Sequence, residues 1–253
     1  MRKQPTGAAD AYPMRINKYL AYRGIATRRA ADDLIARKKV HINGRIAALG
    51  EMVGEGDEAT VRGESSPKEY RYYAYHKPAG VITHSPQRGE KDIKQSVAGI
   101  KDMREVFPVG RLDKDSSGLI ILTNDGRITD RLLSPKYDHD KEYRVRTLQP
   151  LRAGFKKAME AGVDIEGYRT KNCLVRKTGE KSFIIVLTES KKHQIRRMVA
   201  ALHNTVSSLE RTRIVTIGLD ALKPGQWRPI EGKELETFLA AIGMCAPQKK
   251  QGG

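Results

Sequence analysis

Two apolar stretches of strand length are joined by the segment Val109-Gly110-Arg111-Leu112-Asp113-Lys114-Asp115-Ser116-Ser117-Gly118-Leu119. Polar side chains on a loop that a rigid sheet holds in place are a common way to build a functional site. Arg111 and Lys114 lie close to Asp113 and favour its ionised form, and an ionised carboxylate can act as a nucleophile or a base. Asp, Ser and Gly are also ordinary turn residues. From composition alone, the plain turn is the favoured interpretation.

Segments with strand and helix periodicity alternate on both sides of this loop. Tyr143 and Val145 alternate with charged residues, and Phe183–Leu187 is an apolar run of strand length. Helices are predicted over Leu151–Glu160, which follows Pro150, and over Gln194–Leu202, whose apolar residues share one stripe. The periodicity therefore predicts a mixture of strands and helices from Tyr70 onward.

A smaller unit is predicted over residues 14–62. Gly24 is placed to end one short helix, and Thr27 is placed to cap a second. The dipeptide Asn43-Gly44 predicts a tight hairpin, because both turn positions tolerate positive φ. We expect a disordered leader over 1–13, a polar linker over 63–69, the larger domain over 70–245 and a disordered tail over 246–253.

The chain is strongly basic, with 47 Lys and Arg against 30 Asp and Glu and a formal net charge of +17. Such an excess favours a polyanion partner, because cations that neutralise phosphates release condensed counterions; a merely soluble basic protein is the alternative. The small unit carries a basic patch suited to phosphate contacts, although basic helix faces are often only solvated. The candidate RNA-binding residues in this unit are Arg15, Lys18, Arg28, Arg29, Lys38 and Lys39.

The sequence gives little support for a metalloprotein, a disulfide-stabilised protein or a membrane protein. Cys173 and Cys245 lie far apart without a CxxC pattern, and the histidines show no metal-ligand spacing. No apolar run approaches the roughly 18 residues that a bilayer-spanning helix needs. We expect a cytoplasmic protein that holds no metal, and a monomer, because no heptad pattern is present.

The small unit resembles the S4 RNA-binding domain. The resemblance rests on Arg15-Ile16-Asn17-Lys18-Tyr19-Leu20, on Thr27-Arg28-Arg29-Ala30 and on Val40-His41-Ile42-Asn43-Gly44. It implies docking on structured RNA through the face formed by two helices. It does not by itself imply an enzyme.

The larger domain resembles the pseudouridine synthases of the RsuA/RluA type. Gly110-Arg111-Leu112-Asp113, followed by Ser116-Ser117-Gly118-Leu119, resembles their signature. Supporting matches are His76-Lys77-Pro78-Ala79-Gly80-Val81, Lys141-Glu142-Tyr143, and His193-Gln194-Ile195-Arg196-Arg197-Met198. With the S4-like unit in front, the layout matches the RsuA branch and lies closest to the RluF group, which modifies large-subunit ribosomal RNA.

The resemblance implies a set of site residues. Asp113 supplies the essential carboxylate, and its attack on C1′, attack on C6 or removal of a sugar proton are all left open. Tyr143 stacks on the flipped base and Arg196 pairs with Asp113. Without the motif, Tyr143 would be interpreted as a core tyrosine. Ile195 and Leu112 line the base pocket. Arg111 contacts RNA or fills the space that the base leaves, Lys77 is a further RNA-binding candidate, and Arg197 is a phosphate contact or a solvated residue.

Two classes of function follow. The favoured class is an RNA pseudouridine synthase that flips a uridine out of ribosomal RNA, most simply 23S, with transfer RNA as a further substrate class. It needs no cofactor, because uridine and pseudouridine contain the same atoms. The alternative is a non-catalytic RNA- or ribosome-binding protein. The implied fold is α+β, with a mixed, largely antiparallel sheet and a small N-terminal α/β domain.

Overall fold

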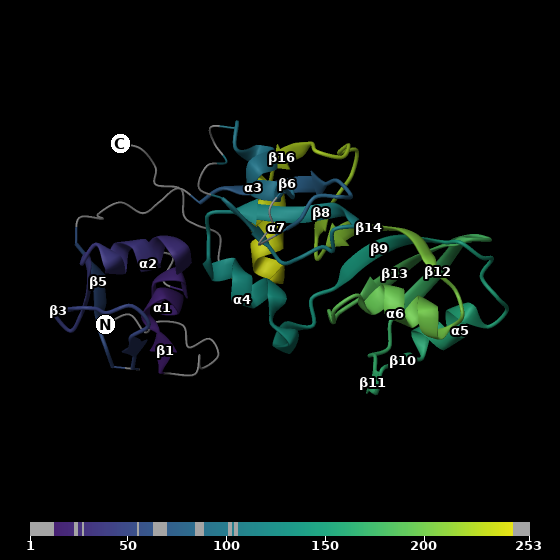
Figure 1. The fold of residues 1–253 in the computed structure, drawn as a ribbon, viewed down its shortest axis with the longest axis horizontal. Helices are drawn as coiled ribbons and strands as arrows, with labels where there is room; N and C mark the ends of the chain where they lie inside the picture. Colours follow the sequence, from purple (N-terminus) through teal and green to yellow (C-terminus); the bar gives the residue numbers. More distant parts are fainter. Residues whose placement is uncertain are drawn as a thin grey trace. The chain divides into compact units, whose positions relative to one another are not determined.

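The computed structural model describes residues 13–22, 25–26, 28–54, 56–62, 70–83, 89–100, 103 and 106–244 (Figure 1). The chain divides into two compact units, and the second comprises Tyr70–Asn124 and the residues from Ile128 onward; the segment Asp125–Arg127 is grouped with the first. The predicted linker and tail, residues 1–12 of the leader, Gly24, Thr27 and Cys245 lie outside the described residues.

In its described residues, the first unit contains two short helices and two small sheets. Its elements are β1 (Met14–Arg15), α1 (Ile16–Tyr22), α2 (Arg28–Ala36), β2 (Val40–Ile42), β3 (Arg45–Ile46), β4 (Met52–Val53) and β5 (Ala59–Val61). The strands pair in the orders β3-β2-β5 and β1-β4. Asn43 and Gly44, with φ of 50° and 81°, form the turn between β2 and β3. The predicted hairpin is therefore confirmed.

The apolar periodicity of the first unit explains its core. Ile16 and Leu20 are fully buried on α1, and they pack with Ala31 and Ile35 of α2 and with Val40 of β2. Positions one helical turn apart lie on one face, so each short helix buries a single stripe. The opposite faces remain available for charged side chains.

The second unit is built on a sheet of nine strands in the order β12-β13-β9-β14-β8-β6-β16, with β7 paired to β8 and β15 to β14. The strands are β6 (Tyr72–Lys77), β7 (Phe107–Val109), β8 (Ser117–Thr123), β9 (Lys141–Thr147), β12 (Leu174–Gly179), β13 (Ser182–Leu187), β14 (Val206–Ile214), β15 (Ile217–Gly218) and β16 (Trp227–Pro229). All pairs are antiparallel except β14 with β8. The prediction of a mixed, largely antiparallel α+β fold is confirmed.

Helices cover both faces of this sheet. They are α3 (Ile93–Val97), α4 (Arg127–Leu133), the 3-10 turn η2 (Pro135–Tyr137), α5 (Phe155–Glu160), α6 (Gln194–Ala201) and α7 (Gly232–Ala241); a separate hairpin is formed by β10 (Asp164–Ile165) and β11 (Tyr168–Arg169). α3, α5 and α6 contribute to one apolar core, and α4 and α7 to the other. None of the described helices combines the length and apolar character that a bilayer crossing requires.

The middle of the central strand β8, residues 119–122, is apolar because it is buried on both faces. Ile120 and Leu122 belong to the core with α6, whereas Leu119 and Ile121 belong to the core with α7. Strand side chains alternate between faces, so a strand covered on both sides carries a continuous apolar run. This rigid strand begins directly after the polar segment that holds Asp113.

The predicted helix at Leu151–Glu160 is shorter than expected. Helix α5 begins at Phe155, because Gly154 adopts a left-handed conformation with φ of 80° at its N-cap. Leu151 is nevertheless buried. The predicted helix over Gln194–Leu202 is confirmed as α6, with Leu202 as its C-cap.

Candidate active site

The loop between β7 and β8 carries Asp113 and is held by side chains from other elements. The Thr83 hydroxyl donates to the Leu112 carbonyl at 2.9 Å and accepts from the Leu112 N–H at 3.2 Å. The Ser116 N–H donates to the Asp113 carbonyl at 3.1 Å, which closes a turn. The carboxylate therefore sits on a backbone fixed on both sides.

Two buried cations donate to carbonyl groups of the same loop and of the segments next to it. The Lys77 ammonium donates to the carbonyls of Pro78, Val81 and Lys114 at 2.9, 2.7 and 3.3 Å. Arg211 is 3% exposed, and its guanidinium donates from Nε to the Leu119 carbonyl at 2.8 Å and from Nη1 to the Arg111 carbonyl at 3.3 Å. The loop backbone is thus tied down at its start, middle and end.

Gly118 permits the close approach of β8 and β14 beneath the loop. It pairs with Arg211 in the parallel register and has φ of 112°, and an added Cβ would lie 2.3 Å from the Arg211 carbonyl oxygen. Residues with a Cβ rarely adopt such a φ. A glycine is therefore required at this position of the sheet.

A cleft of about 260 Å³ opens beside the loop on the face covered by α6. Its lining residues are Arg111, Leu112, Asp113, Ser116, Tyr143, Leu187, Glu189, Ser190, Lys191, Lys192, His193, Gln194, Ile195 and Leu209. The Asp113 side chain is 36% exposed, whereas Leu112, Tyr143 and Ile195 are buried. A solvent-accessible carboxylate thus stands beside an apolar and aromatic wall.

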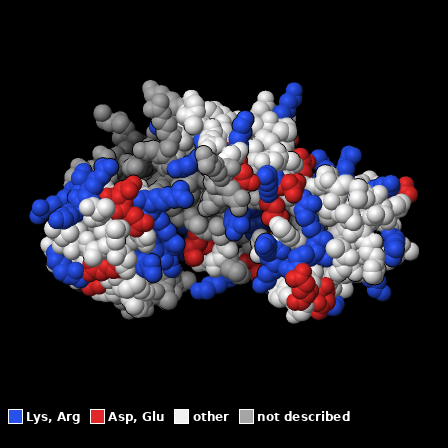
Figure 2. Space-filling view, in the orientation of Figure 1, with Lys and Arg blue, Asp and Glu red and all other residues white. Residues whose placement is uncertain are grey.

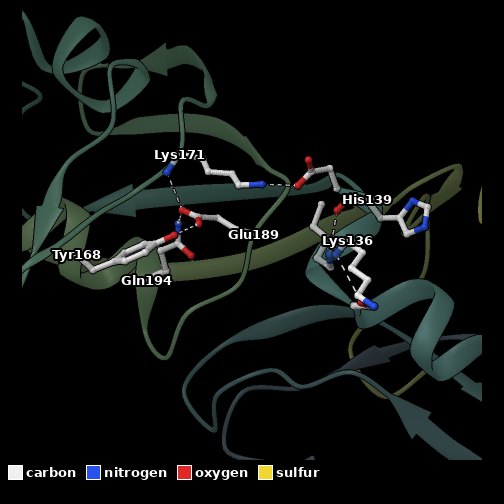
Figure 3. A network of polar contacts seen from close by, with 9 residues as sticks. Lys136, His139, Tyr168, Lys171, Glu189 and Gln194 are labelled. Carbon is white, nitrogen blue, oxygen red and sulfur yellow. Dashed lines mark hydrogen bonds and ion pairs between the residues drawn. The ribbon is translucent and has the colours of Figure 1, made fainter. Parts of the chain in front are cut away.

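Glu189 organises the far wall of this cleft (Figure 3). Its carboxylate accepts from the Tyr168 hydroxyl at 2.5 Å, the Gln194 amide at 2.7 Å and the Lys171 backbone N–H at 2.9 Å. These bonds join β11, the segment before β12 and the first turn of α6. The network fixes the approach to the helix that carries Ile195.

Comparison with known proteins identifies the family. Residues 71–201 match the model described as RNA pseudouridylate synthase, and residues 14–58 match the S4 domain model. The chain belongs to the RNA pseudouridylate synthase family. It is an RNA pseudouridine synthase with an S4 domain at its N-terminal side.

Several relatives support this assignment over most of the synthase. It is 39% identical over 241 residues to "Dual-specificity RNA pseudouridine synthase RluF" of Escherichia coli (strain K12), covering 94% of this chain and 82% of the relative. It is 32% identical over 237 residues to "Ribosomal large subunit pseudouridine synthase B" of Bacillus subtilis (strain 168), covering 89% and 96%. A solved structure, "Crystal structure of pseudouridylate synthase", matches with a TM-score of 0.66 and 30% identity, over 88% of this chain and 98% of that one.

The structure brings five predicted residues of the synthase together in the cleft. These are Arg111, Leu112, Asp113, Tyr143 and Ile195. They come from the β7–β8 loop, from β9 and from α6, and the most distant two, Arg111 and Ile195, are 84 positions apart in sequence. Because these elements pack around one core, the cleft unites motifs that the sequence presents one after another.

Arg196 does not pair with Asp113, contrary to the prediction. Its Nη2 donates instead to the Asp115 carbonyl at 3.3 Å and to the Ser116 hydroxyl at 3.4 Å. Being one residue beyond Ile195 on α6, Arg196 points to the end of the loop and not to its carboxylate. It braces the loop that carries Asp113.

Lys77 and Arg197 also differ from the prediction of RNA contacts. Lys77 is fully buried, because strand alternation turns it toward the core, and its three carbonyl partners occupy the ammonium. Burial, assisted by the charge of Arg211, lowers the pKa of Lys77 to about 8, although the charges of Asp113 and Asp115 oppose this shift. Arg197 pairs with Glu166 at 2.7 Å and donates to the Ile165 carbonyl at 2.9 Å, so it fastens the β10–β11 hairpin to α6.

Sequence reasoning missed the basic rim of the cleft. His193 Nε2 lies 3.5 Å from Asp113 Oδ1, and His193 takes a left-handed conformation with φ of 53° at the N-cap of α6. Lys191 and Lys192 line the same cleft, and the Lys191 ammonium lies 4.3 Å from the centre of the Tyr168 ring. Three basic residues in succession before a helix were the available signal. Arg211 carried no such signal, because its contacts are distant in sequence.

The S4 unit presents its predicted basic residues on its surface. Arg15, Arg28, Arg29, Lys38 and Lys39 are exposed, and Lys18 is half-buried. Figure 2 shows Lys and Arg atoms spread over much of the visible surface of this unit, with small acidic groups between them. Exposed cations of this kind are suited to phosphate contacts.

Proposed function

We propose that this synthase converts uridine to pseudouridine in large-subunit ribosomal RNA, with Asp113 as the essential carboxylate. The observation that carries the proposal is the meeting of Asp113, Tyr143 and Ile195 in one cleft. The printed name of the Bacillus subtilis relative supports the ribosomal large subunit as substrate. No cofactor enters the scheme, because the reaction rearranges atoms that uridine already contains.

The target uridine must leave its helix before it can react. An enzyme cannot reach the N1–C1′ bond within a stacked helix, so the base is flipped out for a few kcal/mol. Tyr143 and Ile195 would receive the base; aromatic stacking contributes about 1–3 kcal/mol. Arg111, which is exposed at the mouth of the cleft, would contact the RNA or occupy the space that the base vacates.

The chemistry would centre on Asp113. Its carboxylate acts on C1′ or C6 of the nucleotide or on a sugar proton, the N1–C1′ bond breaks, and the turned base rejoins the ribose through C5. Tyr143 helps to remove the C5 proton, and N1 of the turned base gains a proton, so that product and substrate contain the same atoms. His193 lies 3.5 Å from the Asp113 carboxylate, and Arg196 positions the loop.

The proposal also includes how the S4 unit binds RNA and where the enzyme works. The exposed cations of the S4 unit bind structured RNA through phosphates, and the enzyme works as a monomer in the cytoplasm, where bacterial ribosomal RNA is made. Transfer RNA is a further substrate class to test. The match of the catalytic family over residues 71–201 favours the enzyme over a protein that only binds RNA.

Pseudouridine mapping tests the substrate. Ribosomal and transfer RNA would be mapped in cells that lack the gene, before and after complementation with the wild-type chain. We expect at least one position in 23S ribosomal RNA to lose its pseudouridine and regain it. Loss confined to transfer RNA or small-subunit RNA would contradict the proposed substrate.

A further inference from the structure

A second, smaller cavity is lined in part by the loop that carries Asp113. Its volume is about 50 Å³, and its lining residues are Val109, Gly110, Arg111, Leu132, Leu133, Lys141, Ser190, Arg211 and Ile214. This lining contains three cationic side chains and one hydroxyl group, and no carboxylate. The space exceeds the roughly 10–15 Å³ that one water molecule needs, and the charged groups in its lining are all cationic.

Arg211, which lines this cavity, carries an unused donor. Nε and Nη1 donate to the carbonyls of Leu119 and Arg111, but Nη2 is buried and has no hydrogen-bond partner among the residues that the structure describes. A buried donor without an acceptor is unfavourable, and more so on a charged group. An oxyanion in the cavity that Arg211 lines would supply the missing acceptor.

Lys141 adds a second buried cation. It is 8% exposed, and its ammonium donates to the His139 carbonyl at 2.9 Å, so that further N–H groups remain to be used. Burial and then the charge of Arg211 lower the pKa of Lys141 to about 8, partly opposed by Asp140. The positive charges of Lys141 and Arg211 repel each other, and an anion between them would stabilise both.

The cavity is adjacent to the active site. Arg111 and Ser190 line both the small cavity and the cleft that holds Asp113. A polyanion that delivers a base to the cleft therefore passes beside the small cavity. Its volume suits a phosphate group and excludes a nucleobase with its sugar.

We propose that the cavity formed by Arg111, Lys141 and Arg211 binds a backbone phosphate of the RNA next to the target uridine. This inference rests on the proposed function, because it takes the RNA substrate as its ligand. Binding there would hold the strand while the neighbouring base is in the cleft. The same phosphate would satisfy Nη2 of Arg211.

The test uses full-length chains and two probes. Unmodified large-subunit ribosomal RNA transcript is bound by the wild type, Lys141→Met and Lys157→Met over a range of salt concentrations; Lys157 is exposed on α5 and lines neither cavity. We expect Lys141→Met to weaken binding about tenfold and to reduce the slope of log K against log salt by roughly 1. Lys157→Met should behave as the wild type.

Inorganic phosphate is the second probe, followed by ³¹P NMR line broadening. The wild type and Lys157→Met should broaden the phosphate signal, and Lys141→Met should not. Leu133→Glu covers the case in which Lys141→Met fails to fold. Leu133 lies at the rim and is 42% exposed, so a carboxylate there should occupy the cavity and abolish the broadening.

The outcomes separate the two proposals. Folded Lys141→Met with wild-type affinity and salt slope would overturn the inference. Phosphate broadening that depends on Lys141, without any change in RNA binding, would show a site for free phosphate and would also overturn the RNA assignment. Pseudouridine formation is measured on the same samples, and its absence from the wild type would contradict the proposed function whatever the phosphate results.

Discussion

Asp113 combines solvent access with a rigid backbone. Its side chain is partly exposed in the cleft, while the Leu112 carbonyl and N–H beside it are bound by Thr83. A plain surface turn has no need for buried groups that hold each of its ends. A carboxylate that must reach a reacting carbon within a few tenths of an ångström does need them.

Arg196 provides the first prediction, because it contacts the loop and not the carboxylate. Arg196→Gln should lower kcat by roughly tenfold to a hundredfold, since a small displacement of a reacting group has effects of this size. KM for RNA should change little. Steady-state kinetics on a ribosomal RNA transcript would show this split, and Arg196→Lys should recover part of the rate.

Arg197→Gln is the matched control on the same helix. Arg197 pairs with the largely exposed Glu166, and exposed ion pairs contribute only about 0–1 kcal/mol. We expect kcat close to wild type. A larger loss of kcat in Arg197→Gln than in Arg196→Gln would contradict the assigned role of Arg196.

Individual site residues also show how much the sequence could predict. The motifs around Asp113, Tyr143 and Ile195 predicted side chains that do line the cleft. They did not predict that Lys77 is buried or that Arg196 contacts Asp115 and Ser116. Those contacts join positions distant in sequence, and they depend on how β6, β8 and α6 pack and not on any local pattern.

Among the elements, the close pairing of β8 with β14 fixes the end of the loop that carries Asp113. Gly118→Ala should lower the free energy of unfolding by about 2–4 kcal/mol, because the added methyl group meets the Arg211 backbone at 2.3 Å in a left-handed conformation. Urea unfolding measures the change. Gly99→Ala is the control, since Gly99 has open space around its Cβ position; equal effects would refute the close-packing argument.

Strand β6 supplies a pH-dependent contribution through Lys77. Burial lowers the pKa of Lys77 from 10.5 to about 8, so the unfolded chain binds more protons than the folded chain between these values. Stability relative to Lys77→Met should therefore rise as pH increases from about 8 to 10.5, by on the order of 3 kcal/mol. The same difference should be constant below pH 7.

Denaturant unfolding of both chains across this pH range measures the difference. Because other titrating groups are common to both proteins, their contributions cancel. A difference that falls with rising pH would show that the charged form of Lys77 stabilises the fold, contrary to its buried position.

In the whole molecule, we expect the S4 unit to bind RNA and the larger unit to carry out the chemistry. The exposed cations of the S4 unit include Arg28, Arg29 and Lys39. Replacing all three with Gln should reduce the slope of log K against log salt by roughly 2 and raise KM, because fewer counterions are released on binding. At saturating RNA, kcat should stay within about twofold of wild type; a loss of kcat with unchanged KM would contradict this division.

The fold as a whole was only partly accessible from the sequence. Alternating residues such as Tyr143 and Val145 predicted strands, and Asn43-Gly44 predicted a turn that the structure confirms. The order of nine strands and the single parallel pair were not predictable, because pairing between distant segments leaves no periodic signal. The resemblance of the ordered motifs, and not periodicity, supplied the architecture.

The central claim is that Asp113 carries out the isomerisation in this cleft. Purified wild type, Asp113→Asn and Asp115→Asn would be incubated with unmodified 23S ribosomal RNA, and pseudouridine formation would be measured under single-turnover conditions. Asp115 is the matched control, since it lies in the same loop and does not line the cleft. We predict no detectable product with Asp113→Asn, wild-type RNA affinity, and substantial product with Asp115→Asn. Product formed by Asp113→Asn at a rate near that of the wild type would contradict the account.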